Sequence, residues 1–200
     1  MKDNTITEWR EVKLGDVCDL IAGFAFKSKD FGNYPNKVIK ITNIEPPFVS
    51  MDNLAGVDLT NYNKKKLEKF MACPGDYVLA MTGATIGKLG CICSGNAYIN
   101  QRVLMFRPKE CIDKRFLYYI LSKYQFTQYI FNHIDSESAQ PNISATTIGK
   151  YEFSLPPLEV QRKIAGVLSA LDDKIELNNK INNNLEPAND NATSAEKEVA

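Results

Sequence analysis

The segment LPPLEVQRKIAGVLSALDDKIELNNKINNNL, residues 155–185, decides how this 200-residue chain is organised. Its two prolines stand where a helix tolerates them, in the first turn, because an N–H there would have no helical partner. No further proline occurs before position 187, and the only glycine is Gly166. The pattern predicts one helix of about 28 residues, roughly 40 Å long.

Apolar residues recur along this helix at two positions per heptad, which is typical of a helix that packs on another helix. Asparagine at such a position lowers stability but fixes register and partner number. The alternative is an ordinary amphipathic helix lying along its own domain. The predicted seam comprises Ile164, Leu168, Leu171, Ile175, Asn178, Asn182 and Leu185.

Length and composition suit one globular domain with an appendage. We expect the domain over residues 1–154, the helix over 155–186 and a disordered polar tail over 187–200. No apolar run reaches the length of a membrane span, and the N-terminus lacks an apolar signal core, so we expect a cytoplasmic protein with no membrane partner. The five cysteines lack framework spacing and are interpreted as reduced thiols.

The net charge is zero, but its distribution is uneven. Residues 156–200 hold five basic and eight acidic side chains, which leaves 19 basic and 16 acidic ones in residues 1–155. A mildly basic domain is therefore followed by a mildly acidic C-terminal segment. This asymmetry is compatible with a phosphate-binding face but does not require one.

The globular part is predicted to be a mixed α/β (α+β) domain, because strand and helix patterns alternate irregularly. Strict βαβ alternation is absent, so a doubly wound sheet is not expected. Strands are predicted over 37–44, 77–82, 89–93, 102–106 and 151–155, and helices over 61–70 and 113–133.

Two short motifs resemble catalytic loops only in part. Gly83 to Lys88 is one residue short of a nucleotide-binding P-loop, and Leu89 stands where magnesium needs a hydroxyl. A tight turn between two strands is favoured, although its backbone N–H groups and Lys88 remain available to a phosphate. Residues 44–48 resemble the catalytic loop of DNA amino-methyltransferases, but the first residue of that box is Glu45 and no glycine-rich methyl-donor loop follows a strand. A proline-terminated strand is favoured there.

The remaining titratable residues do not form a catalytic or metal-binding set. The cysteines lack C-x-x-C spacing, and His133 is the single histidine. We therefore interpret the cysteines as small buried apolar residues and expect no enzyme, no metal and no cofactor.

Polar, basic and small residues in predicted loops form the candidate DNA-binding set. Asn, Gln and Arg can pair with the edges of adenine and guanine, and Lys can contact phosphates. Taken singly, most of these residues are equally compatible with solvated surface. The set is Lys27, Lys29, Lys40, Thr82, Gly83, Lys88, Asn100, Gln101, Arg102, Gln140 and Asn142.

Seven short motifs in a fixed order now add a resemblance over nearly the whole chain. The sequence resembles the specificity subunit of type I restriction-modification systems. Each motif is weak alone, and their order, ending in the proline-led helix, carries the resemblance. They are Trp9 with Leu14-Gly15-Asp16-Val17 and Gly23, then Pro74-Gly75-Asp76, Thr82-Gly83-x-x-Ile86-Gly87, Asn100-Gln101, Gln140-Pro141-Asn142-Ile143-Ser144, Leu155-Pro156-Pro157-Leu158-Glu159-x-Gln161-x-x-Ile164-Ala165 and Leu168-x-x-Leu171-Asp172-x-x-Ile175.

The resemblance implies a non-catalytic target recognition domain that reads one half of a split site in double-stranded DNA. It implies that the long helix pairs as an antiparallel coiled coil and binds methyltransferase (modification) subunits, with a restriction subunit joining the complex. Family members usually carry two domains and two helices, whereas this chain has one of each, so we expect a homodimer on an interrupted palindrome. The alternatives are a DNA adenine methyltransferase fragment, which would bind S-adenosylmethionine, and a protein-interaction adaptor without a DNA role.

Overall fold

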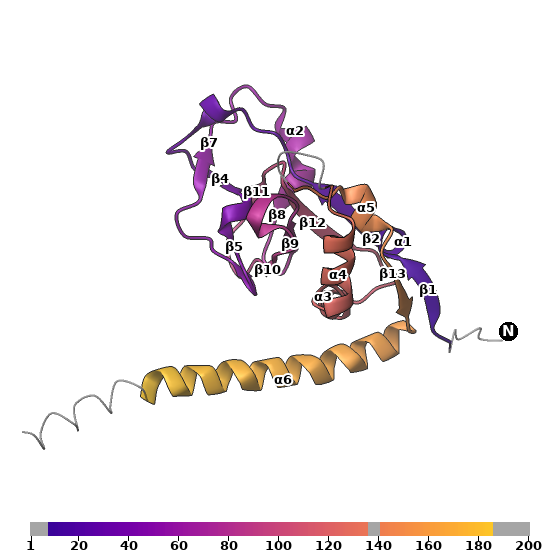
Figure 1. The fold of residues 1–200 in the computed structure, drawn as a ribbon. Coiled ribbons are helices and arrows are strands. Elements are labelled where there is room, and N and C mark those ends of the chain that lie inside the picture. The colour runs from indigo at the N-terminus through magenta and orange to yellow at the C-terminus, as the bar shows by residue number, and fades with distance from the viewer. Residues whose placement is uncertain (1–7, 136–140, 186–200) are drawn as a thin grey trace, which may run out of the picture.

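The computed structural model describes residues 8–135 and 141–185. Gln140 of the candidate DNA-binding set and the predicted tail over 187–200 lie outside this range. Within it, a mixed α/β domain is followed by one long C-terminal helix, which confirms the predicted fold class (Figure 1). The proposed boundaries between domain, helix and tail remain predictions. None of the helices described is long and apolar enough to cross a membrane.

Two mixed sheets form the body of the domain. Most of their pairings are antiparallel, but β10 runs parallel to β6 and β11 runs parallel to β4. The six-stranded sheet has the order β2 (Cys18–Ala22), β12 (Val103–Pro108), β9 (Tyr77–Ala80), β10 (Leu89–Cys91), β6 (Phe48–Val49) and β5 (Ile44–Glu45). The five-stranded sheet has the order β3 (Phe31–Gly32), β7 (Ala55–Val57), β4 (Asn36–Ile39), β11 (Ala97–Ile99) and β8 (Met71–Ala72).

Three apolar clusters hold these layers together. The largest joins one face of the six-stranded sheet to the helices, and it includes Leu104, Phe106, Leu117 and Phe126. A second cluster contains side chains of both sheets, such as Met105 and Ile39.

The helices are α1 (Leu14–Val17), α2 (Lys64–Leu67), α3 (Lys114–Leu121), α4 (Tyr124–Asn132), α5 (Ala145–Gly149) and α6 (Leu158–Leu185).

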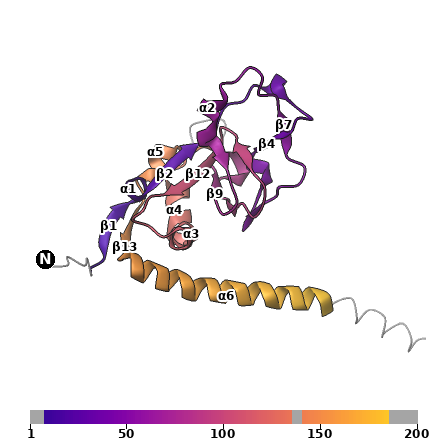
Figure 2. The same cartoon turned by 180° about the vertical axis from the view of Figure 1, so that it is seen from behind.

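The first and last strands of the domain pair with each other. β1 (Arg10–Lys13) and β13 (Glu152–Leu155) run antiparallel, with Arg10 opposite Leu155. The long helix α6 therefore starts beside the point where the domain starts, and from there it extends under the domain and beyond it (Figures 1 and 2).

Two element predictions are wrong in detail. The single helix over 113–133 is two helices, α3 and α4, because Lys123 between them adopts an extended conformation (φ −66°, ψ 143°). Had the first helix continued at about 100° per residue, Phe126 would point roughly 150° away from the buried stripe of α3. The break turns Phe126 and Ile130 into the core. The strand predicted over 37–44 ends at Ile39, and a 3₁₀ turn over Ile41–Asn43 separates it from β5.

Candidate nucleic-acid interface

Loops from distant parts of the sequence meet where several strands end. β2, β4, β9 and β11 finish at the same margin of the domain, and β12 starts there. Backbone hydrogen bonds join the loops: Gly23 N donates to Val103 O (2.9 Å), Phe24 N to Ile99 O (2.9 Å) and Met81 N to Arg102 O (2.9 Å). We call this margin the loop edge; it comprises residues 23–29, Lys40, 81–88, 100–102 and 141–142.

Gly23 permits the close approach at the centre of the loop edge. A Cβ at this position would lie 2.1 Å from the carbonyl oxygen of Asn100 and 2.5 Å from that of Ile99. No side chain fits in that space, so the backbone after β2 packs directly against the β11–β12 loop. The motif glycine thus has a structural reason to be there.

The loop after β9 is fixed by a segment about 60 positions further along the chain. Gly83 N donates to Pro141 O (3.0 Å), and the Thr82 hydroxyl donates to the same carbonyl (3.0 Å). Thr82 also forms a β-bridge with Asn142. Because its side chain is only 4% exposed, Thr82 holds two loops together and does not offer its hydroxyl to solvent, unlike the direct DNA contact expected from the sequence.

Five of the predicted residues present exposed side chains at the loop edge, namely Lys27, Lys29, Lys88, Gln101 and Arg102. Lys40 is half-buried, and its ammonium lies 4.2 Å from the centre of the Phe31 ring. Asn100 is half-buried too, and its side-chain oxygen accepts a hydrogen bond from Gln101 N (2.8 Å). The structure therefore places the predicted cations and amides along the loop edge. The five exposed side chains are free to contact a ligand, whereas Lys40 and Asn100 are partly covered and already in contact with neighbouring groups.

A basic pocket next to the loop edge was missed by the sequence analysis. It has a volume of about 470 Å³ and is lined by Phe24, Lys65, Lys66, Lys69 and Phe70. The run of lysines on the predicted helix over 61–70 was the available signal. What the sequence did not indicate was that α2 and the turn after it lie against the loop led by Gly23.

The predicted helix seam divides into a docked part and a free part. Ile164 packs against the main core and Leu168 is half-buried, so the first turns of α6 lie on the domain. Leu171 and Ile175 are 53% and 58% exposed. Asn178 and Asn182 are exposed as well; Leu185 belongs to α6, but its side chain lies outside the description.

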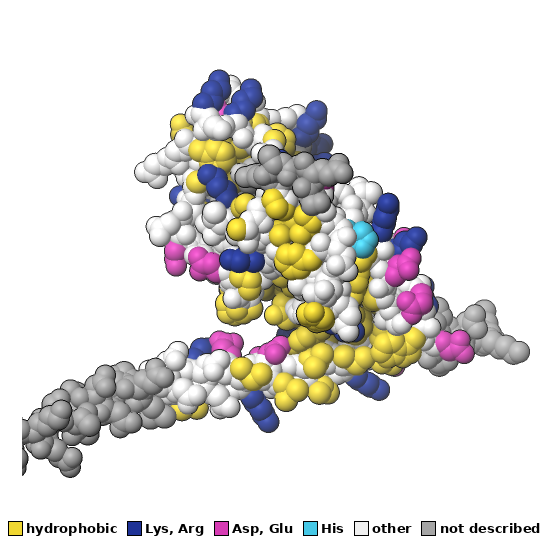
Figure 3. All heavy atoms as spheres, viewed as in Figure 1, with side chains coloured by type: hydrophobic (Ala, Val, Ile, Leu, Met, Phe, Trp, Pro, Cys, Tyr) yellow, Lys and Arg dark blue, Asp and Glu magenta, His cyan; other side chains and the backbone are white. Residues whose placement is uncertain are grey.

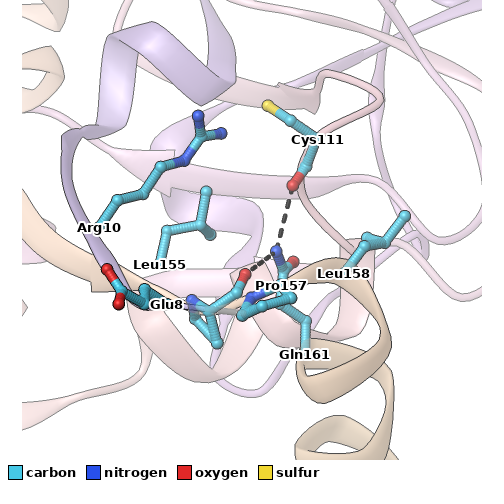
Figure 4. Close-up of a pocket in the computed structure, with 8 residues that line it drawn as sticks. Glu8, Arg10, Cys111, Leu155, Pro157, Leu158 and Gln161 are labelled. Carbon is cyan, nitrogen blue, oxygen red and sulfur yellow. Dashed lines mark hydrogen bonds between the residues drawn. The ribbon is translucent and has the colours of Figure 1, made fainter. Parts of the chain in front are cut away.

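A buried glutamine fixes the joint between domain and helix. The Gln161 side chain, 1% exposed, accepts a hydrogen bond from Asp113 N (2.8 Å) and donates to Cys111 O (3.1 Å) and Pro156 O (2.8 Å). Figure 4 shows it at the base of a pocket lined also by Arg10 and Leu158. Asp113 is in turn the N-cap of α3, so one side chain ties α3 to α6.

Farther along, α6 is separated from the domain by an apolar groove, visible as a hollow in the space-filling view (Figure 3). The groove is about 490 Å³ in volume, with Phe48 on the domain side and Ile175 on α6. At its inner end the Tyr119 hydroxyl donates to Asp172 Oδ2 (2.6 Å). Burial first, then this hydrogen bond and the charge of Asp172, raise the pKa of Tyr119 well above its usual range.

The other motifs form ordinary structural features. Residues 83–85 form a 3₁₀ turn between β9 and β10, as the turn interpretation predicted, and residues 44–49 form the β5–β6 hairpin. Among the residues described, no three His, Cys, Asp or Glu side chains are grouped closely enough to hold a metal ion.

The interpretation of all cysteines as buried is wrong. Cys18 is buried, and burial raises the pKa of its thiol to about 12, but Cys73 and Cys93 are exposed.

Comparison with known proteins gives a consistent family. Residues 6–187 match the model of the type I restriction modification DNA specificity domain. The type I restriction enzyme MjaVIII specificity subunit of Methanocaldococcus jannaschii is 30% identical over 187 residues, which cover 90% of this chain and 43% of that protein. The EcoBI specificity subunit of Escherichia coli is 31% identical over 167 residues, covering 82% and 32%.

Solved structures show the same fold. The HsdS subunit of Thermoanaerobacter tengcongensis superposes with a TM-score of 0.61 at 21% identity, over 84% of this chain and 38% of that one. The S subunit of a type I system from M. genitalium gives 0.58 at 17% identity, over 88% and 42%. The chain thus spans less than half the length of the relatives that it matches. On the match over residues 6–187, the chain belongs to the family of type I restriction-modification DNA specificity domains.

Proposed function

We propose that this chain is a non-catalytic DNA specificity subunit, which reads one half of a bipartite site in duplex DNA through the loop edge. The observation that carries this proposal is the convergence of exposed Lys, Gln and Arg side chains from separate loops onto one margin of a rigid domain. Cations position a protein on phosphates, and Gln and Arg read base edges. Methyl transfer and cleavage belong to the methyltransferase and restriction subunits of the complex.

The free part of the seam supports assembly through α6. Leu171 and Ile175 of the seam, and Ile181 beside it, are large apolar side chains that water contacts over about half of their surface. Such exposure on a projecting helix is typical of an interaction face. We propose that a second copy pairs there in antiparallel orientation. The two-fold axis then places identical domains at opposite ends of the pair, because two 28-residue helices that overlap from Leu171 to Leu185 span roughly 60 Å. The recognised site is an interrupted palindrome, and α6 also binds the methyltransferase subunits.

The DNA part of the proposal is tested with fluorescence anisotropy on a mixed-sequence duplex at several salt concentrations. Replacing Gln101 and Arg102 with Ala is expected to weaken binding at least tenfold. The matched control replaces Gln125 and Arg162, a pair of the same types on α4 and α6, and is expected to leave binding unchanged. Absence of salt-dependent DNA binding by the wild-type chain, even with the methyltransferase subunit present, contradicts the proposal and favours an adaptor.

The assembly part is tested by gel filtration with light scattering at micromolar concentration. The wild type is expected to be a dimer, and Leu171→Asp with Ile175→Asp is expected to be a monomer because charges would be buried in the seam. Ala170→Asp with Asn183→Asp adds the same charge at exposed positions roughly 100–120° from the centre of the seam and should remain dimeric. A strictly monomeric wild type removes the dimer from the proposal, and a dimeric Leu171/Ile175 variant places the interface elsewhere.

A further inference from the structure

The pocket under α2 combines a rigid aromatic wall with a set of lysines. The Phe24 ring lies 5.0 Å from the Phe26 ring and 5.4 Å from the Phe70 ring, centre to centre, and Tyr62 packs on it at 5.6 Å. Phe24 and Phe70 are half-buried, so each still offers part of its surface to the pocket. The wall is therefore fixed in place, while the Lys65, Lys66 and Lys69 side chains are exposed.

These lysines have no acidic partner in the described part of the chain. The ion pairs there involve Lys13, Lys109, Lys114 and Lys180. Asp58 accepts hydrogen bonds from Thr60, and Asp30 accepts one from the Tyr62 hydroxyl. Glu68 lies in the turn after α2 and is exposed, but it belongs to none of these ion pairs. The Lys69 ammonium lies 4.8 Å from the centre of the Phe70 ring. Three lysines against the single carboxylate of Glu68 leave an excess of positive charge beside an apolar wall, which fits a ligand that is both anionic and partly apolar.

The pocket is joined directly to the loop edge. Phe24, which forms its wall, donates its backbone N–H to Ile99 O (2.9 Å) and forms a β-bridge with Asn100. A duplex lying on Gln101 and Arg102 would therefore continue toward α2. Its backbone offers phosphates for the lysines and deoxyribose faces for the two rings, and phosphate contacts supply affinity without reading sequence.

We propose that this pocket binds the sugar–phosphate backbone beside the bases that the loop edge reads, and so supplies affinity that does not depend on sequence. This rests on the DNA-binding function proposed above. Lys65, Lys66 and Lys69 contact phosphates, and Phe24 and Phe70 contact the sugars between them. The pocket anchors the domain while the loop edge discriminates.

The test replaces Lys65, Lys66 and Lys69 together with Gln, which removes three charges but keeps most of each aliphatic stem. Binding to a mixed-sequence 30-base-pair duplex is measured by anisotropy across a salt series. The slope of log affinity against log salt is expected to fall by about 3, one for each lost phosphate contact. At low salt the affinity should fall at least tenfold, equally for duplexes of different sequence.

The matched control replaces Lys123, Lys150 and Lys163 with Gln. These exposed lysines lie before α4, after α5 and on α6, so the variant loses the same net charge away from the pocket. Its salt slope should equal that of the wild type. Circular dichroism melts of both variants check that the fold is intact, and the triple Arg variant at 65, 66 and 69 should keep the wild-type slope.

Two outcomes overturn the inference while leaving the proposed function in place. One is a pocket variant that keeps the wild-type slope and affinity. The other is an equal loss in both variants, which would mean that net charge alone matters. Loss of binding to vesicles containing phosphatidylserine, with DNA binding unchanged, would assign the pocket to a lipid surface instead. If the wild-type chain does not bind duplex DNA at all, it is the proposed function that fails.

Discussion

Two glycines of this chain occupy opposite environments, so alanine is expected to act in opposite directions. At Gly23 a Cβ would lie 2.1 Å from the Asn100 carbonyl oxygen, a backbone atom that is fixed by the sheet. Gly23→Ala should lower the free energy of unfolding by about 1–3 kcal/mol. At Gly166, on the exposed face of α6, nothing lies within 4 Å, and Gly166→Ala should raise it by up to about 1 kcal/mol. Urea denaturation measures both, and equal shifts would contradict this account.

The cysteines provide a second test at this scale. Cys18 is buried, and its raised pKa of about 12 leaves almost no thiolate near pH 8. Cys73 and Cys93 are exposed. In native protein at pH 8, Ellman's reagent should modify Cys73 and Cys93 quickly and Cys18 only after unfolding. Replacing both exposed cysteines with Ser should remove the fast phase. A fast phase that persists would mean that a cysteine other than Cys73 and Cys93 is accessible in the native protein.

Residue identities indicate which side chains of the loop edge are able to contact DNA, but they do not indicate which of these side chains are accessible. Gln101 and Arg102 were selected because of what their side chains can bind, and both are exposed where they were expected to be useful. Thr82 was selected on the same ground and is buried against Pro141. Burial of that kind depends on a contact across 59 positions, and no local pattern encodes such a contact.

Among the elements, α6 is held against the domain by the Tyr119–Asp172 hydrogen bond, and this bond should depend on pH. The pKa of Tyr119 is raised from 10.0 in the folded state, so its contribution to stability is fully present below pH 10 and is lost as pH rises through the folded pKa. Asp172→Asn removes a charge that raises this pKa. In an absorbance titration at 295 nm, one tyrosine that ionises at high pH in the wild type should ionise at lower pH in this variant. Asp173→Asn, whose side chain is exposed, is the control; an identical shift there would exclude a specific bond.

Element lengths explain which predictions succeeded. α6 was predictable because its periodicity runs for 28 residues, whereas strands of two or three residues, such as β3, β6 and β8, carry no usable alternation. The break between α3 and α4 was missed because Ser122 and Lys123 are both compatible with a helix. What ends α3 is the need to bury Phe126, which is a property of the core.

At the scale of the molecule, the joint decides how the domain is carried. Gln161 ties the start of α6 to the N-cap of α3. Because β1 pairs with β13, this joint lies beside the first strand of the domain. The sequence predicted a projecting helix with a continuous seam. In the structure the seam begins on the domain and becomes free only from about Leu171 onward. If two such helices pair, the free part sets the distance between the two domains.

Lengthening that free part should lengthen the recognised site. Inserting seven residues between Asn178 and Asn179 adds about 10 Å to α6 and keeps the seam within about 20° of its phase. In an antiparallel pair the two domains then move apart by the same distance, which corresponds to about three base pairs. Methylation-sensitive sequencing of host DNA should reveal the same half-sites with a gap three base pairs longer. An insertion of five residues turns the seam by about 140° and should abolish dimers and modification. An unchanged gap after the seven-residue insertion would mean that the separation is set by other subunits and not by α6.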